Sequence, residues 1–134
     1  MKQSIAGIIY SQGQFLIGHR IPVGEMGNRW EFPGGKVDPG ETPHETIIRE
    51  FKEEMGVTVS IGELITTVEF SNRNGTVQLL AYRVFFPSHE EVILTEHSEI
   101  KWATLHEIEQ MVFVDSDKLL FPYLKKWSSD EKSS

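Results

Sequence analysis

The sequence predicts an α/β fold, a sandwich built around a mixed β-sheet. Three observations support this prediction: extended, β-branched segments recur along the chain, one strongly patterned helix lies among them, and a second helix closes the sequence. Elements of these types bury their apolar faces against one another around a shared core. A chain of 134 residues suits one domain and can bury a core without disulfides, which the absence of cysteine excludes.

The N-terminal part of the chain is expected to form strands separated by turns. Residues 4–10 are apolar and rich in Ile, and residues 15–20 return to an extended pattern after the turn SQGQ. Proline and glycine punctuate residues 21–28, which are therefore expected to form a loop. A short strand at residues 30–32 is expected to lead into a tight loop rich in proline and glycine.

The clearest helix begins at Pro43 and ends before Gly56. Thr42 is a good N-cap, proline suits the first helical position, and Glu45 completes a capping box. Gly56 suits the C-terminal cap of the same helix.

An apolar stripe on this helix is expected to face the core. Ile48, Phe51 and Met55 recur at i, i+3 and i+7, with Ile47 at the edge of the stripe. The stripe is predicted to be separate from the acidic residues around Glu50.

The second half of the chain is expected to add a hairpin, short strands and a closing helix. Residues 57–70 are predicted to be extended with a break near Gly62, and SNRNG is predicted to turn the chain into a second long strand at 76–86. The remaining predicted elements are short strands at 91–95 and 99–104, a short helix at 105–111, and a closing helix at 116–127 that is interrupted or starts anew near Pro122. Residues 1–127 are expected to form the single domain and residues 128–134 a disordered polar tail.

Charge and hydropathy exclude some classes of partner. The net charge of −7 does not attract a nucleic-acid duplex, although the same charge serves solubility in many proteins. A compact anion such as a nucleotide is still an acceptable ligand if a cation neutralises the local charge. The N-terminus reads as a strand, and the chain has no apolar run long enough to span a membrane. We therefore expect a cytoplasmic protein that binds no membrane.

Three glutamates of the predicted helix share one face. Glu53 lies about 60° to one side of Glu50 and Glu54 about 40° to the other. Like charges at these spacings cost a few tenths of a kcal/mol each, and neither Arg49 nor Lys52 points into the cluster.

The residues alone leave two interpretations of this face open. It is either a solvated acidic surface or a metal site. Glycine and proline at positions 34, 35, 39 and 40 form a loop that can bring backbone carbonyls close to the carboxylates. Hard divalent cations such as Mg²⁺ bind such oxygen ligands.

The spacing of the glutamates resembles the Nudix box. Gly35 is followed after five residues by Glu41, and after seven more by the run REFKEEMGV. Every fixed position of the box is matched, with Phe51 where Ile, Leu or Val is more usual. The stretch WEFPGGKVDPGETP is similar to the MutT-like group of Nudix hydrolases, and the resemblance covers residues 3 to about 127.

The resemblance implies an α/β/α sandwich that cleaves a nucleoside diphosphate linked to another group, with Mg²⁺ or Mn²⁺. It implies catalytic roles for Arg49, Glu50, Glu53 and Glu96. It implies metal ligands at Glu50, Glu53, Glu54 and the carbonyl of Gly35. Glu41 is expected to steady the loop or hold a water of the metal, and Gly56 is structural. His97, beside Glu96, is expected to be an exposed loop histidine.

The MutT-like resemblance also implies a substrate class. The expected reaction converts 8-oxo-dGTP or a related nucleoside triphosphate to the monophosphate and pyrophosphate. The alternatives are another nucleoside diphosphate derivative, such as ADP-ribose, and a non-catalytic nucleotide sensor. A sensor would often lose a glutamate of the box, and this chain keeps them all. The proline that some ADP-ribose-cleaving relatives carry after the box is absent between Val57 and Phe86.

Residues outside the box are candidates for binding the substrate. Arg20 is either a phosphate contact or a surface arginine at a strand end. The candidate walls of a base pocket are Phe32, Leu80 and Tyr82. Asp115 is either a base-reading residue or the N-cap of the last helix. Trp30 and Trp102 are expected in the core.

Overall fold

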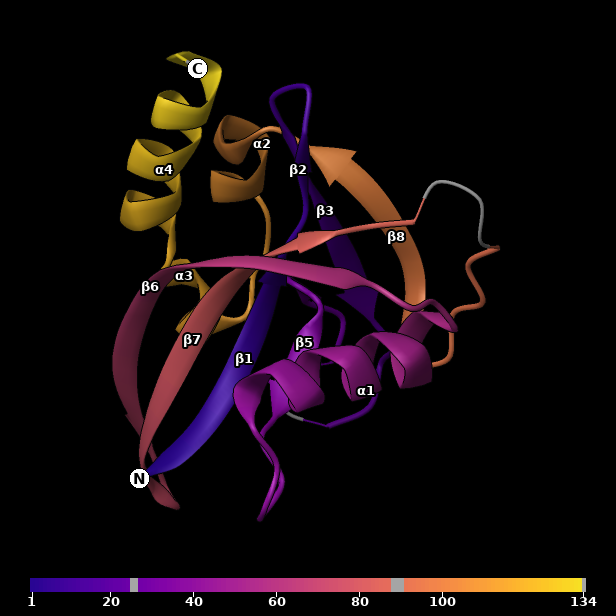
Figure 1. The fold of residues 1–134 in the computed structure, drawn as a ribbon, viewed down its shortest axis with the longest axis vertical. Coiled ribbons are helices and arrows are strands. Elements are labelled where there is room, and N and C mark those ends of the chain that lie inside the picture. Colours follow the sequence, from indigo (N-terminus) through magenta and orange to yellow (C-terminus); the bar gives the residue numbers. More distant parts are fainter. Residues whose placement is uncertain (25–26, 88–90, 134) are drawn as a thin grey trace.

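The computed structural model describes residues 1–24, 27–87 and 91–133, and its strands are flanked by helices (Figure 1). In chain order the elements are β1 (Lys2–Ile8), β2 (Tyr10–Ser11), β3 (Gln14–Arg20), β4 (Trp30–Glu31), β5 (Gly34–Lys36), α1 (Pro43–Met55), β6 (Ser60–Asn72), β7 (Gly75–Phe85), β8 (His97–Ala103), α2 (Leu105–Glu109), α3 (Asp115–Lys118) and α4 (Phe121–Ser133). Among these elements, no helix is long and apolar enough to cross a membrane.

The strands form a mixed sheet and an antiparallel sheet. In the mixed sheet the order is β5-β1-β7-β6, where β1 and β7 are parallel and the other neighbours are antiparallel. In the second sheet β3 pairs with β2, β4 and β8, all antiparallel. The predicted mixed sheet is therefore confirmed.

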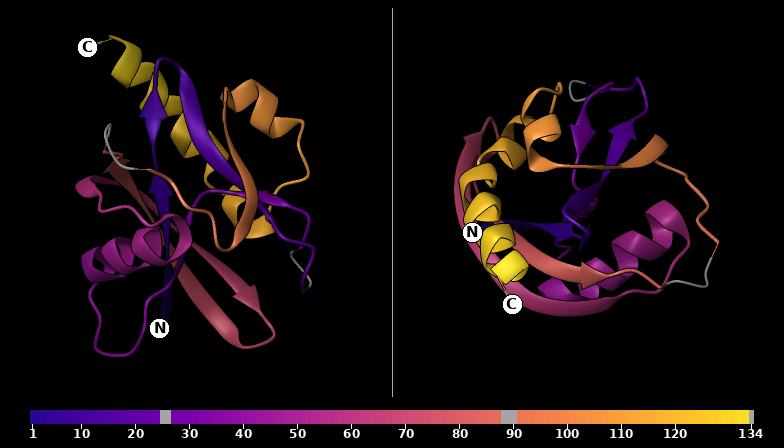
Figure 2. Two further views of the ribbon diagram at one scale, coloured as in Figure 1. Left: turned by 90° about the vertical axis from the view of Figure 1, so that its right-hand side faces the viewer. Right: turned by 90° about the horizontal axis from the view of Figure 1, so that it is seen from above.

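Helices cover the strands on two sides, as the right-hand view of Figure 2 shows for α1 and α4. Successive side chains of a strand point to opposite faces, and β1 follows this rule. Its Ile5 belongs to the apolar cluster that contains Phe51 of α1. Ile8 belongs to the other cluster, with Ile108 of α2 and Leu124 of α4. This arrangement is the predicted α/β/α sandwich.

Helix α1 has the ends that the sequence predicts. Thr42 Oγ1 accepts a hydrogen bond from the backbone N–H of Glu45 at 3.1 Å, and Glu45 Oε1 accepts one from the N–H of Thr42 at 2.8 Å. Gly56 closes the helix with φ 71°, a left-handed conformation that glycine adopts without strain.

The core-facing stripe of α1 is rotated from the predicted one. Ile47, Phe51 and Met55 are fully buried, whereas Ile48 is 39% exposed. The buried residues repeat at i and i+4, so the stripe is centred on the Ile47 side of the helix and not on the Ile48 side. The rotation has a consequence for the acidic residues, because it turns Glu50 toward the interior.

The predictions for residues 34–36 and 91–95 are wrong. Residues 34–36, expected as loop, form β5 at the edge of the mixed sheet. Residues 91–95, expected as a strand, instead cap the C-terminal end of α1. The backbone N–H groups of Ile93 and Thr95 donate to the carbonyls of Met55 and Glu54 at 2.9 and 3.1 Å. Those carbonyls have no partner within their own helix, so the segment supplies one.

Other elements follow the prediction with small shifts. A tight turn after Asn72 joins β6 and β7, and the register of β6 shifts between Ile61 and Thr66, near the expected break. Helix α4 starts anew at Phe121 with Pro122 next to it. It continues to Ser133, so the segment expected as a disordered tail is helical over residues 128–133. Part of the predicted loop 21–28, residues 25–26, lies outside the described residues.

The tryptophans are less buried than predicted. Trp102 lies on β8 and is 42% exposed. Trp30 is half-buried, with the ring of His19 at 4.8 Å and the ammonium of Lys101 at 5.2 Å from its ring centre.

The rotation of α1 predicts unequal costs for two adjacent substitutions. Ile47→Ala removes fully buried methylene groups and should lower the free energy of unfolding by about 2–5 kcal/mol. Ile48→Ala, at an exposed position of the same helix, should change it by less than about 1 kcal/mol. Urea denaturation of both variants measures the difference. Equal losses would contradict the observed orientation of the helix.

Candidate active site

Two of the three clustered glutamates are buried, and one of them, Glu50, lies against Gly35 of β5. Glu50 and Glu54 are 9% and 1% exposed, whereas the side chain of Glu53 is 53% exposed. A Cβ atom at Gly35 would lie 2.5 Å from Glu50 Cδ, so only glycine allows the backbone of β5 to approach this carboxylate. The structure therefore brings the predicted backbone ligand next to a predicted carboxylate ligand.

Arg49 organises the exposed side of this cluster. Its Nε and Nη2 atoms donate to the two carboxylate oxygens of Glu41 at 2.7 and 3.0 Å, a bidentate pair. Its Nη1 atom donates to Glu50 at 2.8 Å and to Glu53 at 3.2 Å. Arg49 thus has the geometry expected of a residue that orients the glutamates.

Glu41 steadies the loop before the helix. Besides the pair with Arg49, its Oε1 atom accepts hydrogen bonds from Thr46 Oγ1 at 2.7 Å and from the backbone N–H of Asp38 at 3.1 Å. The hydrogen bonds from Arg49 and Thr46 lower the pKa of Glu41 to about 2. Glu41 therefore holds its negative charge at any working pH.

The surroundings of Glu54 disfavour its ionised form. Burial raises its pKa to about 10, and the charges of Glu50, Glu31 and Glu96 act in the same direction. Its Oε2 atom is buried and has no hydrogen-bond partner among the described residues. Burial also raises the pKa of Glu50. Buried charges are stable when they are paired or coordinate a metal.

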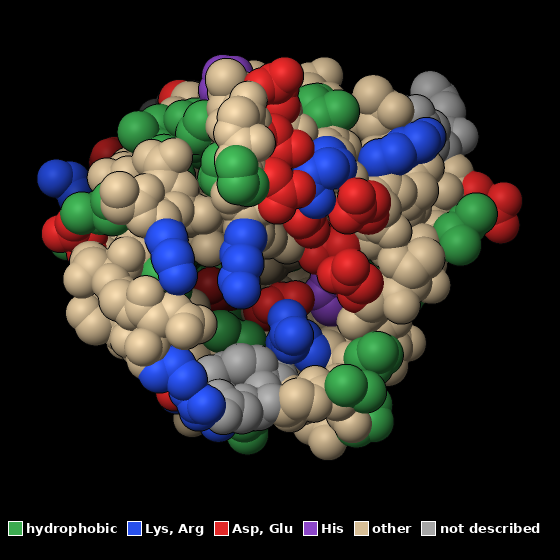
Figure 3. All heavy atoms as spheres, turned by 90° about the horizontal axis from the view of Figure 1, so that it is seen from below, with side chains coloured by type: hydrophobic (Ala, Val, Ile, Leu, Met, Phe, Trp, Pro, Cys, Tyr) green, Lys and Arg blue, Asp and Glu red, His purple; other side chains and the backbone are tan. Residues whose placement is uncertain are grey.

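The arrangement of these carboxylates fits a divalent cation. One oxygen from each of Glu50, Glu54 and Glu96 lies within 4.8 Å of those of the other two. The structure thus brings Glu96, for which the resemblance implies a catalytic role, close to Glu50 and Glu54 of the box. Hard cations bind such oxygen ligands, and Glu54 Oε2, which has no hydrogen-bond partner among the described residues, is available to coordinate one. Figure 3 shows acidic side chains gathered around a hollow on this face, with Lys and Arg side chains near its rim.

The histidine beside Glu96 is not the exposed loop residue that was predicted. His97 begins β8 and is 4% exposed, with Nε2 2.8 Å from Glu31 Oε2. The other oxygen of Glu31 accepts a hydrogen bond from Arg20 Nη1 at 3.1 Å. Arg20 therefore pairs with a carboxylate at the edge of the acidic cluster. The sequence analysis does not identify Glu31 as a site residue, although it lies in the stretch WEFPGG that is similar to the MutT-like group.

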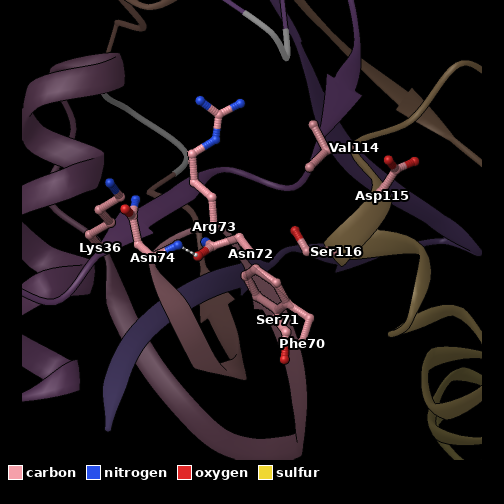
Figure 4. A pocket seen from close by; sticks show the side chains of 9 residues that line it. All are labelled: Lys36, Phe70, Ser71, Asn72, Arg73, Asn74, Val114, Asp115 and Ser116. Carbon is pink, nitrogen blue, oxygen red and sulfur yellow. Dashed lines mark hydrogen bonds between the residues drawn. The ribbon is translucent and has the colours of Figure 1, made fainter.

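A cavity of about 760 Å³ lies between the β6–β7 turn and the start of α3 (Figure 4). Its lining consists of Lys36, Phe70, Ser71, Asn72, Arg73, Asn74, Val114, Asp115 and Ser116. Lys36 follows Gly35 in the chain, and its carbonyl accepts a hydrogen bond from Arg49 at 3.1 Å. One lining residue of the cavity is therefore bonded to the arginine that contacts Glu41, Glu50 and Glu53.

Asp115 lines the cavity, whereas the other predicted pocket residues do not. Asp115 is the first residue of α3, and its carboxylate lies 3.4 Å from Arg29 and 3.5 Å from Lys118. It is not an N-cap, a position that Val114 occupies.

The predicted aromatic and apolar walls lie elsewhere in the fold. Phe32 and Leu80 are 3% and 7% exposed and belong to the two apolar cores. Tyr82 packs against His44 of α1, with ring centres 5.1 Å apart. The alternation of β7 turns Leu80 and Tyr82 toward α1, and the ring of Phe32 packs against Phe113 in the other core. None of the three predicted wall residues therefore lines this cavity.

Asp117 is a structural acid that sequence reasoning missed. It is 6% exposed, and its Oδ2 atom accepts a hydrogen bond from the backbone N–H of Phe32 at 2.9 Å. The bond ties α3, which carries Asp115, to the loop that leads into Gly35. Burial raises the pKa of Asp117 to about 7, with the charge of Glu31 acting in the same direction. The sequence shows two aspartates in FVDSD, Asp115 and Asp117, and nothing local to them indicates that Asp117 is the buried one.

Comparison with known proteins gives a consistent assignment. A family model described as the NUDIX domain matches residues 1–124. The chain is 29% identical over 118 residues to the CTP pyrophosphohydrolase of Escherichia coli (strain K12), covering 87% of this chain and 86% of that protein. It is 33% identical over 117 residues to the putative 8-oxo-dGTP diphosphatase 2 of Mycobacterium tuberculosis (strain ATCC 25618 / H37Rv), covering 85% and 81%.

Solved structures share the fold over nearly the whole length of the chain. The solution structure of the E. coli ORF135 protein matches with a TM-score of 0.84 and 25% identity, covering 100% of this chain and 95% of that one. The crystal structure of the MutT protein from Methanosarcina mazei Go1 matches with a TM-score of 0.80 and 24% identity, covering 98% and 95%.

The burial of Asp117 predicts a pH-dependent stability. Between about pH 4 and pH 7 the unfolded chain releases the proton of Asp117 while the folded chain retains it, so stability should fall as pH rises through this window. Asp117→Asn keeps an acceptor for Phe32 and removes the ionisation. In urea denaturation with chelator present, the variant should gain stability relative to wild type by up to about 1.4 kcal/mol per pH unit in that window.

Above pH 7 the difference between the two proteins should become constant, because both states of the wild type are then ionised. The exposed Asp115→Asn variant is the matched control and should show no such gain. A flat difference for Asp117→Asn across the window would contradict the burial argument.

Proposed function

The chain belongs to the NUDIX domain family as a MutT-like Nudix hydrolase, and from this premise we propose that it hydrolyses nucleoside triphosphates to the monophosphate and pyrophosphate with Mg²⁺ or Mn²⁺. The observation that carries the proposal is the group of three carboxylates, Glu50, Glu54 and Glu96, whose oxygens lie within 4.8 Å of one another and whose spacing fits a divalent cation. Such a site suits a compact, highly charged ligand. We propose a cytoplasmic location, because nucleoside triphosphates are found there and a chain without cysteine is compatible with a reducing compartment.

Relatives support the nucleotide class. One relative is named a CTP pyrophosphohydrolase and another a putative 8-oxo-dGTP diphosphatase. The cavity carries the cationic side chains of Lys36 and Arg73, which suit phosphate oxygens. We propose that the phosphates lie at the Lys36 end and the base toward Asp115.

The chemistry of the site follows from the charges that it holds. When bound, a divalent cation neutralises phosphate charge and makes a coordinated water a better nucleophile. Glu53 is the box glutamate most open to solvent, so it is the carboxylate placed to accept a proton from an attacking water. Arg49 holds Glu50 and Glu53 in position through the same Nη1 atom. Fixed geometry of this kind lowers the reorganisation needed during the reaction.

Base recognition is proposed to involve Asp115. Its carboxylate, paired with Arg29 and Lys118, presents oxygens that accept hydrogen bonds. Bases with amino or imino groups on the recognised edge, such as guanine and cytosine, offer matching donors.

Glu53→Gln tests the reaction. Purified enzyme with Mg²⁺ is offered CTP, dCTP, dGTP, 8-oxo-dGTP and ADP-ribose, and the products are separated. The best triphosphate should yield monophosphate and pyrophosphate, and Glu53→Gln should reduce its turnover by about a hundredfold or more because a proton acceptor is lost. Glu109→Gln, at an exposed position of α2, is the matched control and should retain activity. Cleavage of ADP-ribose alone would refute the triphosphate assignment, and unchanged turnover in Glu53→Gln would refute its role.

Asp115→Ala tests base recognition separately. Loss of a charge-assisted hydrogen bond should lower kcat/KM for the preferred triphosphate by roughly 10- to 100-fold. Inorganic triphosphate, which has no base, should compete with substrate equally well in both proteins. Asp130→Ala, on α4, controls for loss of a surface charge. If the order of preferred bases and the rate are both unchanged, Asp115 does not read the base.

A further inference from the structure

We propose that Thr95 is a positioning residue that fastens Glu96 to the last turn of α1 and thereby places the Glu96 carboxylate at the cation cluster. The inference rests on the proposed function, in which Glu96 acts together with Glu50 and Glu54. It gives a functional role to hydrogen bonds that otherwise only cap the C-terminal end of α1.

Glu96 belongs to the acidic cluster but not to the helix that carries the other two carboxylates. Glu50 and Glu54 are held by α1, whereas Glu96 is exposed and lies in the segment between β7 and β8. One of its oxygens nevertheless lies within 4.8 Å of an oxygen of each of the other two. When all three carboxylates are ionised they repel one another, so contacts outside the cluster are needed to hold Glu96 in this place.

Thr95, the residue before Glu96, is tied to the turn of α1 that carries the box glutamates. Its hydroxyl donates to the carbonyl of Glu53 at 2.6 Å, and its backbone N–H donates to the carbonyl of Glu54 at 3.1 Å. Carbonyls in the last turn of a helix lack partners within the helix, so they can accept from an outside segment. Two bonds from one residue fix the direction in which the chain continues to Glu96.

His97, the residue after Glu96, is anchored as well. It begins β8 with 4% exposure, and its Nε2 atom is 2.8 Å from Glu31 Oε2. A Cβ atom at Gly18 of β3 would lie 2.6 Å from the His97 ring, so glycine makes room for the ring against the strand. Glu96 therefore stands between one anchor on α1 and another in the antiparallel sheet. A carboxylate positioned in this way loses little freedom when it binds an ion.

The competing explanation is that Thr95 only caps α1. A cap stabilises the helix whether or not residue 96 is a carboxylate, so losing the hydroxyl would then have the same consequences in any background. A positioning role acts through Glu96 and disappears when that carboxylate is removed. Thr95 is not among the residues that line the cavity, so its effect should fall on kcat and not on KM.

A double-mutant cycle with Thr95→Val and Glu96→Gln separates the two explanations. Valine keeps the shape of threonine and removes the hydroxyl donor. In the otherwise wild-type full-length chain, Thr95→Val should weaken the binding of Mn²⁺ alone by about tenfold and lower kcat for the best triphosphate by about tenfold. In the Glu96→Gln background the same substitution should change either quantity by less than about twofold. Thr95→Ser, which keeps the hydroxyl, should behave as wild type.

Thr67→Val, on β6, is the matched control and should leave Mn²⁺ binding and kcat unchanged. Urea denaturation of the same proteins measures the capping contribution separately. Effects of Thr95→Val that are equal in the two backgrounds, or no effect in the wild-type background, would overturn the positioning role. Coupling of Thr95 to Glu96 in Mn²⁺ binding, with no triphosphate hydrolysed by the wild-type protein, would instead refute the proposed function alone.

Discussion

The desolvation of Glu54 is the constraint on which the rest of the site depends. Its carboxylate is 1% exposed, stands among other acids, and has an oxygen without a partner in the described part of the chain. A group in this situation either keeps a proton or receives a cation. We propose that this cost is retained because the same burial gives the carboxylate a desolvated position in which it can bind a divalent ion.

Fixing both ends of α1 makes this arrangement possible. The capping box at Thr42 starts the helix, and residues 91–95 satisfy the carbonyls at its other end. Arg49 then distributes one positive charge over Glu41, Glu50 and Glu53. Lys36, which lines the cavity, accepts a hydrogen bond from Arg49, and Asp117 ties α3, on the other side of the cavity, to the loop before Gly35. The acidic cluster and the cavity are consequently held by the same hydrogen-bonded segments.

Local patterns in the sequence predicted the features that depend on neighbouring residues. The capping box, the left-handed Gly56, the β6–β7 hairpin and the restart of the helix at Pro122 follow from side chains a few positions apart. The spacing of glutamates and glycines in the box identified the acidic cluster and its family. Such features are readable because short-range sterics and hydrogen bonds decide them before any distant segment packs.

Tertiary packing alone decided which side of each element became buried. The sequence determined that α1 carries an apolar stripe and an acidic group, but only contact with the sheet selected Ile47 over Ile48 and buried Glu50 and Glu54 while leaving Glu53 exposed. The loop-like neighbours of His97 predict a surface position, yet its partner Glu31 is 66 positions away. The two meet because β3 pairs with β4, which carries Glu31, and with β8, which carries His97. Asp117 likewise bonds to a backbone group 85 positions away. Burial is a property of the assembled layers, so a local pattern can name the candidate side chains but cannot say which of them lose water.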